Sequence, residues 1–598
     1  MNKDYRDRVF YENCQIIVKD LKTCRILTEA FVKSIELAEG MGSLIPISYF
    51  MVEDPELIDL LGKWRKENAF AYPSIFEVTK EGTKKWLENA IINNSDRILF
   101  LIIDRYGNKV GHIGYANCSS KKAELEIDNV LKGKKDASKE IMYYSLKAII
   151  RWAEKILLPK RIFLKVLSDN SHAIEFYKRF GFVEGNRIGL KKIESSNRVD
   201  WKMDTDGPFD KYFVEMDYHS HFRIPENDKI LTAGPSVSSL EQYYTYDATL
   251  YGWNNKWNKY LKKFEDEFAE YIGVKHAIAT SCCTGALHLS LVALDIGPGD
   301  EVIVPDMTWV ASAQVINYVG ATVIFSDIDF TSWTMDPQSL ESKITKNTKA
   351  IIPVHMYGHP AEMDKIIEIA RKYNLYIIED AAPSLGAEFK GKRTGSFGDF
   401  SAFSFQGAKL AVTGEGGMLL TNNDKLFEKV YKIWDQGRVS GTFWIDVIGW
   451  KYKMSNMQAA FGLGQLQRVN TLVEAKRQIF NWYADGLKGY SQLKLSYEKE
   501  WARSNYWMSS IYLNNECAIS RDEMIKELKK RNIDSRPVFP AISQFPIWPK
   551  MQEPQTISKD VGNRGMNLPS GVCLRYEEIQ YICEQIEDIL NGSMNMSI

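Results

Sequence analysis

Residues 400–417, FSAFSFQGAKLAVTGEGG, place one lysine, Lys409, in a stretch that is otherwise small, apolar or rich in glycine. The part that reads FSAFSFQ predicts a buried strand, and the lysine follows soon after it. Lysine is normally a solvated surface residue, because burial disfavours its charged form and lowers its pKa. The neutral amine of a buried lysine is a nucleophile that forms a Schiff base with a carbonyl cofactor. Lys409 is therefore the first candidate catalytic residue of the chain.

The bulk composition excludes several classes of protein. The 598 residues are too many for one hydrophobic core, and their number suggests roughly three to four folding units. With 76 basic and 77 acidic residues, the chain has no net field that favours nucleic acid or an anionic membrane. The eight cysteines are scattered without a CxxC pair, and the sequence has neither a secretory signal nor an apolar run of membrane-spanning length. We expect a cytoplasmic, reduced, metal-free protein that binds a small substrate.

The chain divides into two halves that differ in their pattern of predicted strands and helices, and both are of the α/β class. We expect a mostly helical extension over 1–43, a domain of short strands and helices over 44–218, and a polar linker over 219–236. Over 237–450, near-continuous apolar strands alternate with amphipathic helices, which indicates a parallel sheet covered on both faces. Residues 451–598 become helical and then mixed, as in a small α+β subdomain.

A buried lysine suits pyridoxal 5′-phosphate (PLP), which also needs a carboxylate for its pyridinium nitrogen, donors for its phosphate and a flat group over its ring. Asp380 ends the buried strand in LYIIEDAAPSLGA, where a carboxylate reaches a ligand at the edge of a parallel sheet. The amides of Cys283, Thr284 and Gly285 begin a helix, and they would point at a phosphate along the helix dipole. Trp309 follows another strand, where its indole can stack on the ring.

The C-terminal half resembles the DegT/DnrJ/EryC1/StrS family of nucleotide-sugar aminotransferases, which have the PLP fold type I. The resemblance covers about 228–595 and rests on ordered motifs, which makes it specific. These motifs are YIGVKHAIATSCCTGALHLSLVALDIGPGDEVIVP, PVHMYGHPAEMD, EDAAPSLGA, GKRTGSFGDFSAFSFQGAKLAVTGEGG, GWKYKMSNMQAAFGLGQLQRV and NLPSG.

The resemblance implies a role for each of these site residues. It makes Lys409 the covalent PLP carrier and proton shuttle, and it pairs Asp380 with the pyridine nitrogen. Thr284 and Ser404 hold the phosphate, and Trp309 lies over the ring. Related dehydratases have histidine in place of the lysine, so the lysine favours transamination.

The family also dimerises, and its GWKYKMSN loop reaches into the neighbour's site. Lys451 stands where the family commonly has an asparagine on the partner's cofactor phosphate, and it would act there as a point charge. Two other positions depart from the family pattern: Pro383, followed by Ser384, replaces a Gln or Glu that contacts the ring hydroxyl, and Cys283 replaces a glycine. His355 and Arg438 are equally compatible with a structural role, and neither is assigned to catalysis.

The N-terminal half contains LSDNSHAIEFYKRFGFVEGN, residues 167–186, which predicts a helix capped by Asp169 or Asn170. The same pattern is compatible with an amphipathic helix whose Tyr177 is simply part of the core. It also resembles motif B of the GNAT acyltransferases, whose fold is a mixed sheet with flanking helices. That resemblance implies acetyl-CoA as co-substrate, Tyr177 as the general acid that protonates the leaving thiolate, and Asn170 among the cofactor contacts.

A pyrophosphate-binding loop is expected upstream, in AELEIDNVLKGKKDASKEIMYYSL. Backbone amides at a helix start would cradle the pyrophosphate of acetyl-CoA, with lysine charges beside them. Only one glycine of the usual consensus is present. The predicted contacts are Gly133, Lys134, Lys135, Ala137 and Ser138. Glu126 or Asp128, on the central strand, could deprotonate the attacking amine through water, but the sequence favours a solvent-facing carboxylate for each.

Together, the halves predict a bifunctional enzyme that acts on an NDP-4-keto-6-deoxyhexose. PLP-dependent transamination from L-glutamate would give an amino sugar, and acetyl-CoA would then acetylate it for O-antigen, capsule or glycoprotein glycans. Transamination comes first, because a ketone has no nitrogen to acetylate. Two alternatives stay open. In one, the GNAT half binds CoA or nucleotide sugar without turnover. In the other, the aminotransferase is the sole catalyst, on a non-hexose keto sugar, and the N-terminal half serves an unrelated amine. The nucleotide, the sugar stereochemistry and the position of amination are not given by the sequence.

Overall fold

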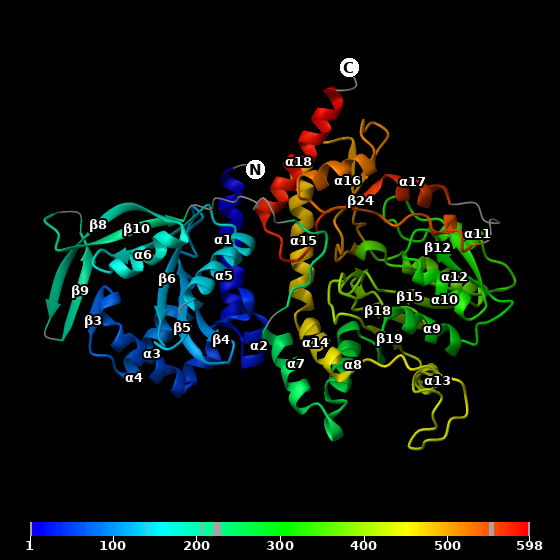
Figure 1. Ribbon diagram of the computed structural model, residues 1–598, viewed down its shortest axis with the longest axis horizontal. Coiled ribbons are helices and arrows are strands. Elements are labelled where there is room, and N and C mark those ends of the chain that lie inside the picture. Colours follow the sequence, from blue (N-terminus) through cyan, green and yellow to red (C-terminus); the bar gives the residue numbers. More distant parts are fainter. Residues whose placement is uncertain are drawn as a thin grey trace. The chain divides into compact units, whose positions relative to one another are not determined.

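The computed structural model describes residues 3–138, 140–195, 197–204, 207–218, 229–237, 239–548 and 555–595. The chain forms two compact units (Figure 1). One contains residues 1–223 with 238–240, and the other contains residues 224–237 with 241–598. Among the described residues, no helix has the length and apolar character that a membrane span requires.

The N-terminal unit is built on one mixed ten-stranded sheet. In a simple meander all neighbouring strands are antiparallel. Here β6 and β7 run parallel, so the sheet is mixed, as expected. In spatial order the strands are β1 (Ile35–Leu37), β2 (Gly42–Pro46), β4 (Ile98–Asp104), β5 (Lys109–Ala116), β6 (Glu124–Lys132), β7 (Arg161–Leu167), β10 (Lys211–Tyr218), β8 (Phe182–Ser195), β9 (Arg198–Met203) and β3 (Ser74–Phe76).

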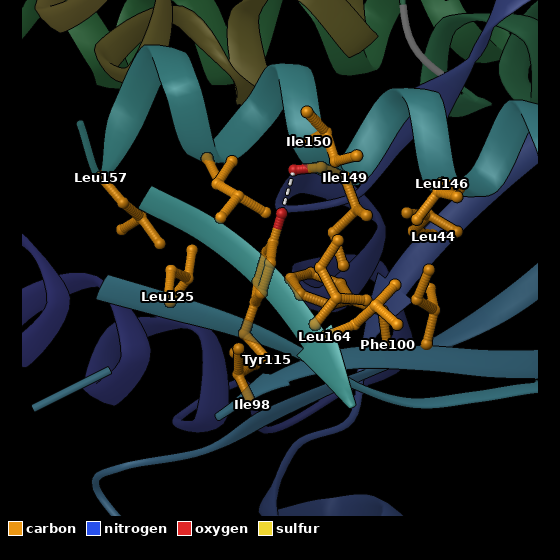
Figure 2. Packing of buried hydrophobic residues seen from close by; sticks show 14 of the residues in the cluster. Leu44, Ile98, Phe100, Tyr115, Leu125, Leu146, Ile149, Ile150, Leu157 and Leu164 are labelled. Atoms are coloured by element: carbon orange, nitrogen blue, oxygen red, sulfur yellow. Dashed lines mark hydrogen bonds between the residues drawn. The ribbon is translucent and has the colours of Figure 1, made fainter. Parts of the chain in front are cut away.

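Both faces of this sheet are covered by buried side chains. Alternate residues of a strand point to opposite faces, so neighbouring residues can belong to different buried clusters. On β4, Phe100 belongs to one buried cluster and its neighbour Leu101 to the other. Figure 2 shows the first cluster, where Ile149 and Ile150 of α5 pack on the strands. The hydroxyl of Tyr115 donates a 2.8 Å hydrogen bond to the carbonyl of Ile149. The helices of the unit are α1 (Lys3–Lys22), α2 (Leu27–Val32), α3 (Pro55–Glu67), α4 (Lys80–Trp86), α5 (Ile141–Ile156) and α6 (Ser171–Phe180).

Residues 1–43 are mostly helical, as expected, but they are an integral part of the N-terminal unit and do not form an extension. Phe10 and Cys14 of α1 are buried in the same cluster as Phe100. Strand β1 pairs with β2, and the predicted boundary at residue 43 falls inside β2. The reason is that the apolar face of α1 is buried by the sheet.

The expected linker over 219–236 lies partly outside the described residues. Its second half is bound to the C-terminal unit. The amide of Ile230 donates to the carbonyl of Asn532 at 2.9 Å, and the hydroxyl of Thr232 donates to Asp534 at 2.6 Å. This part of the linker is therefore an element of the second unit.

The C-terminal unit contains a seven-stranded sheet in which five consecutive strands, from β18 to the edge strand β13, are parallel, and β19 is antiparallel to both of its neighbours. In spatial order the strands are β11 (His276–Thr280), β19 (Gly417–Thr421), β18 (Phe400–Ser404), β15 (Tyr376–Asp380), β14 (Thr348–Ile351), β12 (Glu301–Pro305) and β13 (Thr322–Ser326). Both faces are covered here too, since Val302 and Val304 of β12 join one buried cluster and Ile303 joins another. The predicted α/β class with a largely parallel sheet is confirmed.

Helices and two small sheets complete this unit. Its helices are α7 (Ser239–Tyr251), α8 (Lys259–Ile272), α9 (Cys283–Ala293), α10 (Ala311–Tyr318), α11 (Pro337–Ser342), α12 (Met363–Tyr373), α13 (Asp424–Trp434), α14 (Asn456–Gln467), α15 (Val469–Gly486), α16 (Arg521–Lys530), α17 (Thr556–Arg564) and α18 (Tyr576–Asn595). The four-stranded sheet of the expected α+β part comprises β20 (Leu493–Leu495), β22 (Ser510–Leu513), β24 (Gly565–Asn567) and β23 (Arg536–Pro537), and the three-stranded sheet comprises β17 (Lys392–Arg393), β16 (Glu388–Phe389) and β21 (Ala502–Arg503).

Candidate active sites

The carboxyl edge of the parallel sheet brings three of the predicted residues together. Strands β15 and β18 are parallel neighbours, and Asp380 at the end of β15 pairs with Ala402 of β18. Strand β18 ends at Ser404, and the chain then turns to Lys409. Because parallel strands end at one edge, Asp380, Ser404 and Lys409 lie at the same side of the sheet, where α/β proteins bind ligands.

Lys409 has the environment that the sequence predicted. Its side chain is largely enclosed, and burial lowers the pKa of its amine to about 8. The nearby Asp380 and Cys283 act in the opposite direction and raise this pKa, but burial has the larger effect. The Nζ atom lies 3.8 Å from the ring centroid of Trp507. At a pKa of about 8, roughly a tenth of this amine is neutral and nucleophilic at pH 7, far more than for a solvated lysine.

Asp380 is 5% exposed and is held by two donors. The hydroxyl of Ser312 donates to its Oδ2 at 2.7 Å, and the amide of Ala382 donates to its Oδ1 at 3.1 Å. Sequence reasoning missed Ser312, although it lies three residues after Trp309, in the first turn of α10. A polar residue in the first turn of a helix that follows a parallel strand was the available signal.

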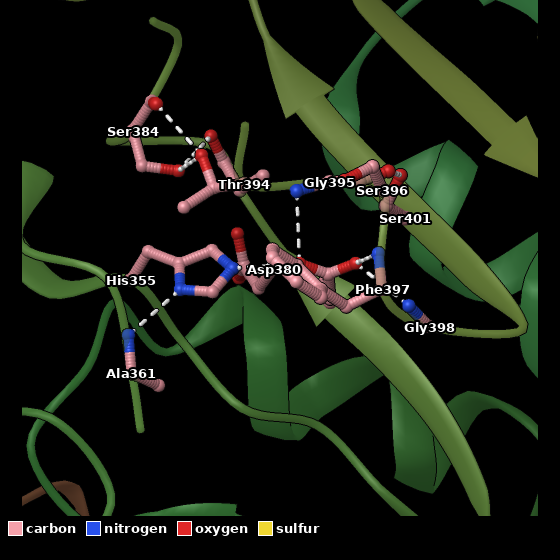
Figure 3. A network of polar contacts seen from close by, with 12 residues as sticks. His355, Ala361, Asp380, Ser384, Thr394, Gly395, Ser396, Phe397, Gly398 and Ser401 are labelled. Atoms are coloured by element: carbon pink, nitrogen blue, oxygen red, sulfur yellow. Dashed lines mark hydrogen bonds and ion pairs between the residues drawn. The ribbon is translucent and has the colours of Figure 1, made fainter. Parts of the chain in front are cut away.

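Glu379, beside Asp380, is buried in a polar network (Figure 3). Its carboxylate accepts hydrogen bonds from the amides of Gly395, Phe397 and Gly398 at 2.6–2.8 Å. His355 lies 2.9 Å from the same carboxylate through Nε2, and its Nδ1 accepts from the amide of Ala361. Since Nδ1 is an acceptor, Nε2 carries the proton and donates to Glu379. His355 therefore fixes the end of β15 and has no contact that indicates catalysis.

The two positions after Asp380 that depart from the family pattern also have structural contacts. The carbonyl of Pro383 accepts from Nδ2 of Asn505 at 3.0 Å, and the hydroxyl of Ser384 pairs with that of Thr394 at 2.9 Å. Ser384 is fully buried.

The start of α9 and the end of β18 form the candidate phosphate site. Ser404 pairs with Gly417 on β19, and a Cβ atom added to Gly417 would lie 2.6 Å from the amide nitrogen of Cys283. Ser404 and the first turn of α9 therefore meet across Gly417. The predicted amide of Gly285 is already used, because it donates to Sγ of the N-cap residue Cys282 at 3.3 Å. Cys283, Thr284 and Ser404 remain the candidate phosphate ligands.

Trp309 is 60% exposed and lies at one end of a row of aromatic rings. Its ring centroid is 5.6 Å from that of Phe539, which stacks on Tyr357 at 5.5 Å. Tyr357 stacks on Trp507 at 5.9 Å, and Trp507 contacts Lys409. The row links Trp309 to Lys409, and a position over the cofactor ring stays a prediction for Trp309.

The GWKYKMSN loop lies against the start of α9 in its own chain. The amide of Ser281 donates to the carbonyl of Tyr452 at 2.6 Å, and the Tyr452 ring packs over Gly285. Lys451 is exposed. Its contact with the phosphate of a partner's cofactor stays a prediction.

The residues at this edge fit PLP by their donor and acceptor types. The fit rests on the enclosed amine of Lys409, the buried carboxylate of Asp380, and the hydroxyl and amide donors at the start of α9. When bound, PLP would supply the carbonyl carbon and the electron-withdrawing ring that amino-group transfer requires.

In the N-terminal unit, Tyr177 on α6 is 7% exposed and packs against Phe176 and Phe182. Burial raises the pKa of its phenol, and the nearby Asp128 raises it further. The phenol therefore keeps its proton at neutral pH, as a general acid must. Asp128 lies beside a bulge in β6, where Asn129 has a φ of 52°.

The two candidate bases of the N-terminal unit have different surroundings. Glu126 pairs with Lys165 at 3.0 Å, and burial raises the pKa of its carboxyl group. Asp128 lies 3.3 Å from Arg97 and is the one that influences Tyr177. The charge of Asp128, rather than that of Glu126, therefore acts on the phenol of the candidate acid.

The predicted pyrophosphate loop needs a correction. The amides of Gly133 and Lys134 both donate to the carbonyl of Val110, at 2.9 and 3.0 Å, so they continue the sheet and do not face a phosphate. A Cβ atom on Gly133 would lie 2.1 Å from the ring of Trp64. Glycine is therefore required at this position by the packing of Trp64. Contacts of acetyl-CoA with the rest of the loop stay predictions for Lys135, Ala137 and Ser138.

Asn170 is the cap of α6. Its Oδ1 accepts a hydrogen bond from the amide of Ala173 at 3.2 Å, so this oxygen is used by the helix. The sequence had left Asp169 and Asn170 as alternative caps. A cofactor contact of Asn170 would have to come from its remaining polar atoms.

Comparisons with known proteins agree with both predicted domain families. A family model described as the DegT/DnrJ/EryC1/StrS aminotransferase family matches residues 238–587, and one described as an acetyltransferase (GNAT) domain matches residues 48–183. The GDP-perosamine synthase of Escherichia coli O157:H7 is 41% identical over 355 residues, which are 59% of this chain and 96% of that protein. The GDP-perosamine synthase of Caulobacter vibrioides is 39% identical over 365 residues, 60% of this chain and 98% of that protein.

Solved structures give the same result for the C-terminal unit. A putative sugar aminotransferase from Streptococcus pneumoniae, in its PLP form, has a TM-score of 0.57 and 27% identity, and the match covers 61% of this chain and 99% of that one. An aminotransferase from Psychrobacter cryohalolentis has a TM-score of 0.56 and 28% identity, with 61% and 100% covered. The chain belongs to the DegT/DnrJ/EryC1/StrS family of PLP-dependent aminotransferases, and ahead of that part it carries a GNAT acetyltransferase domain.

Proposed function

We propose that the chain is a bifunctional sugar-nucleotide enzyme. Its C-terminal unit transfers an amino group from L-glutamate to an NDP-4-keto-6-deoxyhexose, and its N-terminal unit acetylates the new amine with acetyl-CoA. The relatives named GDP-perosamine synthase support GDP as the nucleotide. The product would be a nucleotide-linked acetamido sugar for O-antigen, capsule or glycoprotein glycans, made in the cytoplasm.

The observation that carries the aminotransferase half is the enclosed amine of Lys409 near Asp380. Lys409 would hold the cofactor covalently and move protons with Nζ when that link is open. Asp380 would keep the cofactor's ring nitrogen protonated, with its own carboxylate fixed by Ser312. Thr284 and Ser404 would bind the phosphate at the helix start.

In the acetyltransferase half, Tyr177 would protonate the leaving thiolate of CoA. Support comes from its burial, which keeps the phenol protonated, and from the nearby carboxylate of Asp128. Asp128 would accept the proton of the attacking amine, directly or through water. The order of the two reactions follows from chemistry, because acetylation needs the nitrogen that transamination delivers.

A homodimer formed through the C-terminal unit is part of this proposal. The loop that follows α13, which projects in Figure 1, carries a run of exposed apolar side chains, and Phe443 is 96% exposed. Monomeric proteins rarely expose contiguous apolar surface of this kind. The other exposed members of the run are Trp444, Ile445, Val447 and Ile448.

A second candidate function is favoured by the pyrophosphate loop. Because the amides of Gly133 and Lys134 are bonded within the sheet, the loop offers fewer backbone donors for a pyrophosphate than the sequence predicts. In this alternative the chain is an aminotransferase whose GNAT domain does not turn over the same sugar.

One experiment separates the two candidates. The purified protein is incubated with PLP, L-glutamate, acetyl-CoA and a panel of NDP-keto-deoxysugars, and the sugar nucleotides are followed by mass spectrometry. Conversion of one keto sugar to its amine and then to its acetamide supports the bifunctional proposal. An amine that accumulates with acetyl-CoA in excess supports the second candidate, and a panel left unchanged contradicts both.

A further inference from the structure

Trp507 of the C-terminal unit contacts the catalytic lysine, although no motif in the sequence points to it. It lies between β21 and β22, and it is 5% exposed. Its ring centroid is 3.8 Å from Nζ of Lys409. The indole Nε1 also donates a 2.8 Å hydrogen bond to the carbonyl of Ala408, the residue before the lysine. The side chain of Trp507 therefore contacts both the amine of Lys409 and the backbone just before it.

Trp507 is itself fixed from several sides. Its amide donates to Oδ1 of Asn505 at 2.8 Å, and its carbonyl accepts from Nζ of the buried Lys476 at 2.8 Å. Its ring stacks on Tyr357 with an angle of 23° between the planes. A side chain with this many constraints keeps one rotamer, so the indole face presented to Lys409 is preorganised.

Asn505 also connects Trp507 to the segment after Asp380. Its Nδ2 donates to the carbonyls of Pro383 and Leu385, at 3.0 and 2.9 Å. The loop that carries Trp507 and the loop that follows Asp380 therefore share one buried amide. The position of the indole is defined relative to the carboxylate as well as to the lysine.

Three elements face the amine of Lys409. Strand β15 contributes the carboxylate of Asp380, α9 contributes the thiol of Cys283, and the β21–β22 connection contributes the indole of Trp507. The face of an indole attracts a cation, and this attraction is stronger where water is excluded. The indole of Trp507 therefore favours the ammonium form of Lys409 against the face of its ring, whereas burial of Lys409 favours the neutral amine.

We propose that Trp507 is a positioning residue for Lys409, whose indole face receives the lysine ammonium whenever Nζ is not bonded to the cofactor. A lysine that alternates between a covalent link and proton transfer needs a defined place to hold its proton. The indole supplies that place near Asp380. The inference rests on the proposed role of Lys409 as the cofactor lysine.

The test measures the titration of Lys409 in the full chain freed of PLP. Trace labelling with an acid anhydride over a range of pH, read at the Lys409 peptide by mass spectrometry, gives the pKa of this amine without any turnover. Tryptophans fluorinated to increasing degrees on the six-membered ring are placed at position 507 alone. These analogues keep the shape of the side chain and weaken its attraction for a cation.

The proposal predicts that the pKa of Lys409 falls stepwise with fluorination, by about one unit for the fully fluorinated ring. The same analogues at Trp501, which packs against Phe389 in this unit and does not contact Lys409, should leave the pKa unchanged. A pKa that does not fall on fluorination at 507, or that falls equally on fluorination at 501, overturns the proposal.

A second measurement separates this inference from the proposed function. Unsubstituted protein is mixed with PLP, reduced with borohydride and digested, and the mass of the Lys409 peptide is read. Absence of the cofactor on Lys409 contradicts the proposed role of the lysine, and with it the inference, whatever the titration gives. Linkage to Lys409 without a response to fluorination contradicts the role of Trp507 alone.

Discussion

The hydroxyl of Ser312 donates a 2.7 Å hydrogen bond to Oδ2 of Asp380, and both side chains are buried. A hydrogen bond to a charged group contributes about 1.5–3 kcal/mol, and a buried carboxylate that loses a donor bears the cost directly. Ser312 therefore helps to fix the orientation of the Asp380 carboxylate, which is proposed to face the ring nitrogen of PLP.

The S312A substitution should weaken PLP binding by roughly tenfold, since the loss of about 1.4 kcal/mol corresponds to that factor. Equilibrium titration of protein fluorescence with PLP measures this change. S290A is the matched control, because Ser290 is equally buried and its hydroxyl donates to the carbonyl of Ala286 in its own helix. Unchanged PLP affinity in S312A would contradict a contribution of this hydrogen bond to PLP binding.

Substitution of Glu379 by glutamine should destabilise the C-terminal unit by about 2–4 kcal/mol. The carboxylate accepts three backbone amides and His355, and an amide NH₂ group would face one or more of these donors. Urea unfolding of the full chain, followed by tryptophan fluorescence, measures the change. The exposed Glu428 on α13 gives the control E428Q, whose midpoint should match that of the unsubstituted protein. Equal midpoints for E379Q and E428Q would contradict the structural role of this network.

Glu265 on α8 should make the stability of the protein depend on pH. Burial raises the pKa of its carboxyl group to about 7, although its oxygen accepts from the amide of Ala279 at 2.8 Å. The folded state therefore binds a proton that the unfolded state releases above about 4.5, and the stability from this group is lost as pH rises from about 4.5 to 7. E265Q should be more stable than the unsubstituted protein at pH 8 and similar at pH 4.5, as measured by urea unfolding at both values. A deficit at pH 8 would contradict this assignment.

The Y177F substitution should lower acetyl transfer by roughly 10² or more and leave transamination unchanged, because only the phenol proton is removed. Separate rates of amine and acetamide formation, measured by mass spectrometry, test this expectation. Y115F is the control: Tyr115 is buried in the same cluster, and its hydroxyl bonds the carbonyl of Ile149. Equal losses in the two variants would assign Tyr177 to the core alone.

Local signals in the sequence were sufficient for much of the C-terminal site. Asp380 and Ser404 end apolar strands that the pattern itself predicts to be parallel, so their meeting at one edge follows from the strand pairing. Trp507 and Ser312 could not be found in this way. Trp507 reaches Lys409 only through the packing of the small subdomain on the large one, and no periodicity encodes that contact.

Gly133 is a residue that the sequence did single out, but for the wrong reason. A glycine between lysines before a helix is typical of a phosphate loop, but a glycine is also needed wherever another group approaches the backbone closely. Here the group is the ring of Trp64, which comes from a distant helix. The sequence therefore predicted the fold of this domain correctly, and it assigned the wrong cause to this residue.

The central claim is that both halves act in turn on one sugar nucleotide, and the most direct measurement supplies the intermediate itself. The K409A variant, which lacks the amine proposed to hold PLP, is given acetyl-CoA and the GDP-linked 4-amino-4,6-dideoxy sugar, and the product is weighed by mass spectrometry. The account predicts that this variant makes the acetamide at the rate of the unsubstituted protein, while it makes no amine from the keto sugar. An amino sugar that stays unacetylated, in K409A and in the unsubstituted protein alike, would contradict it.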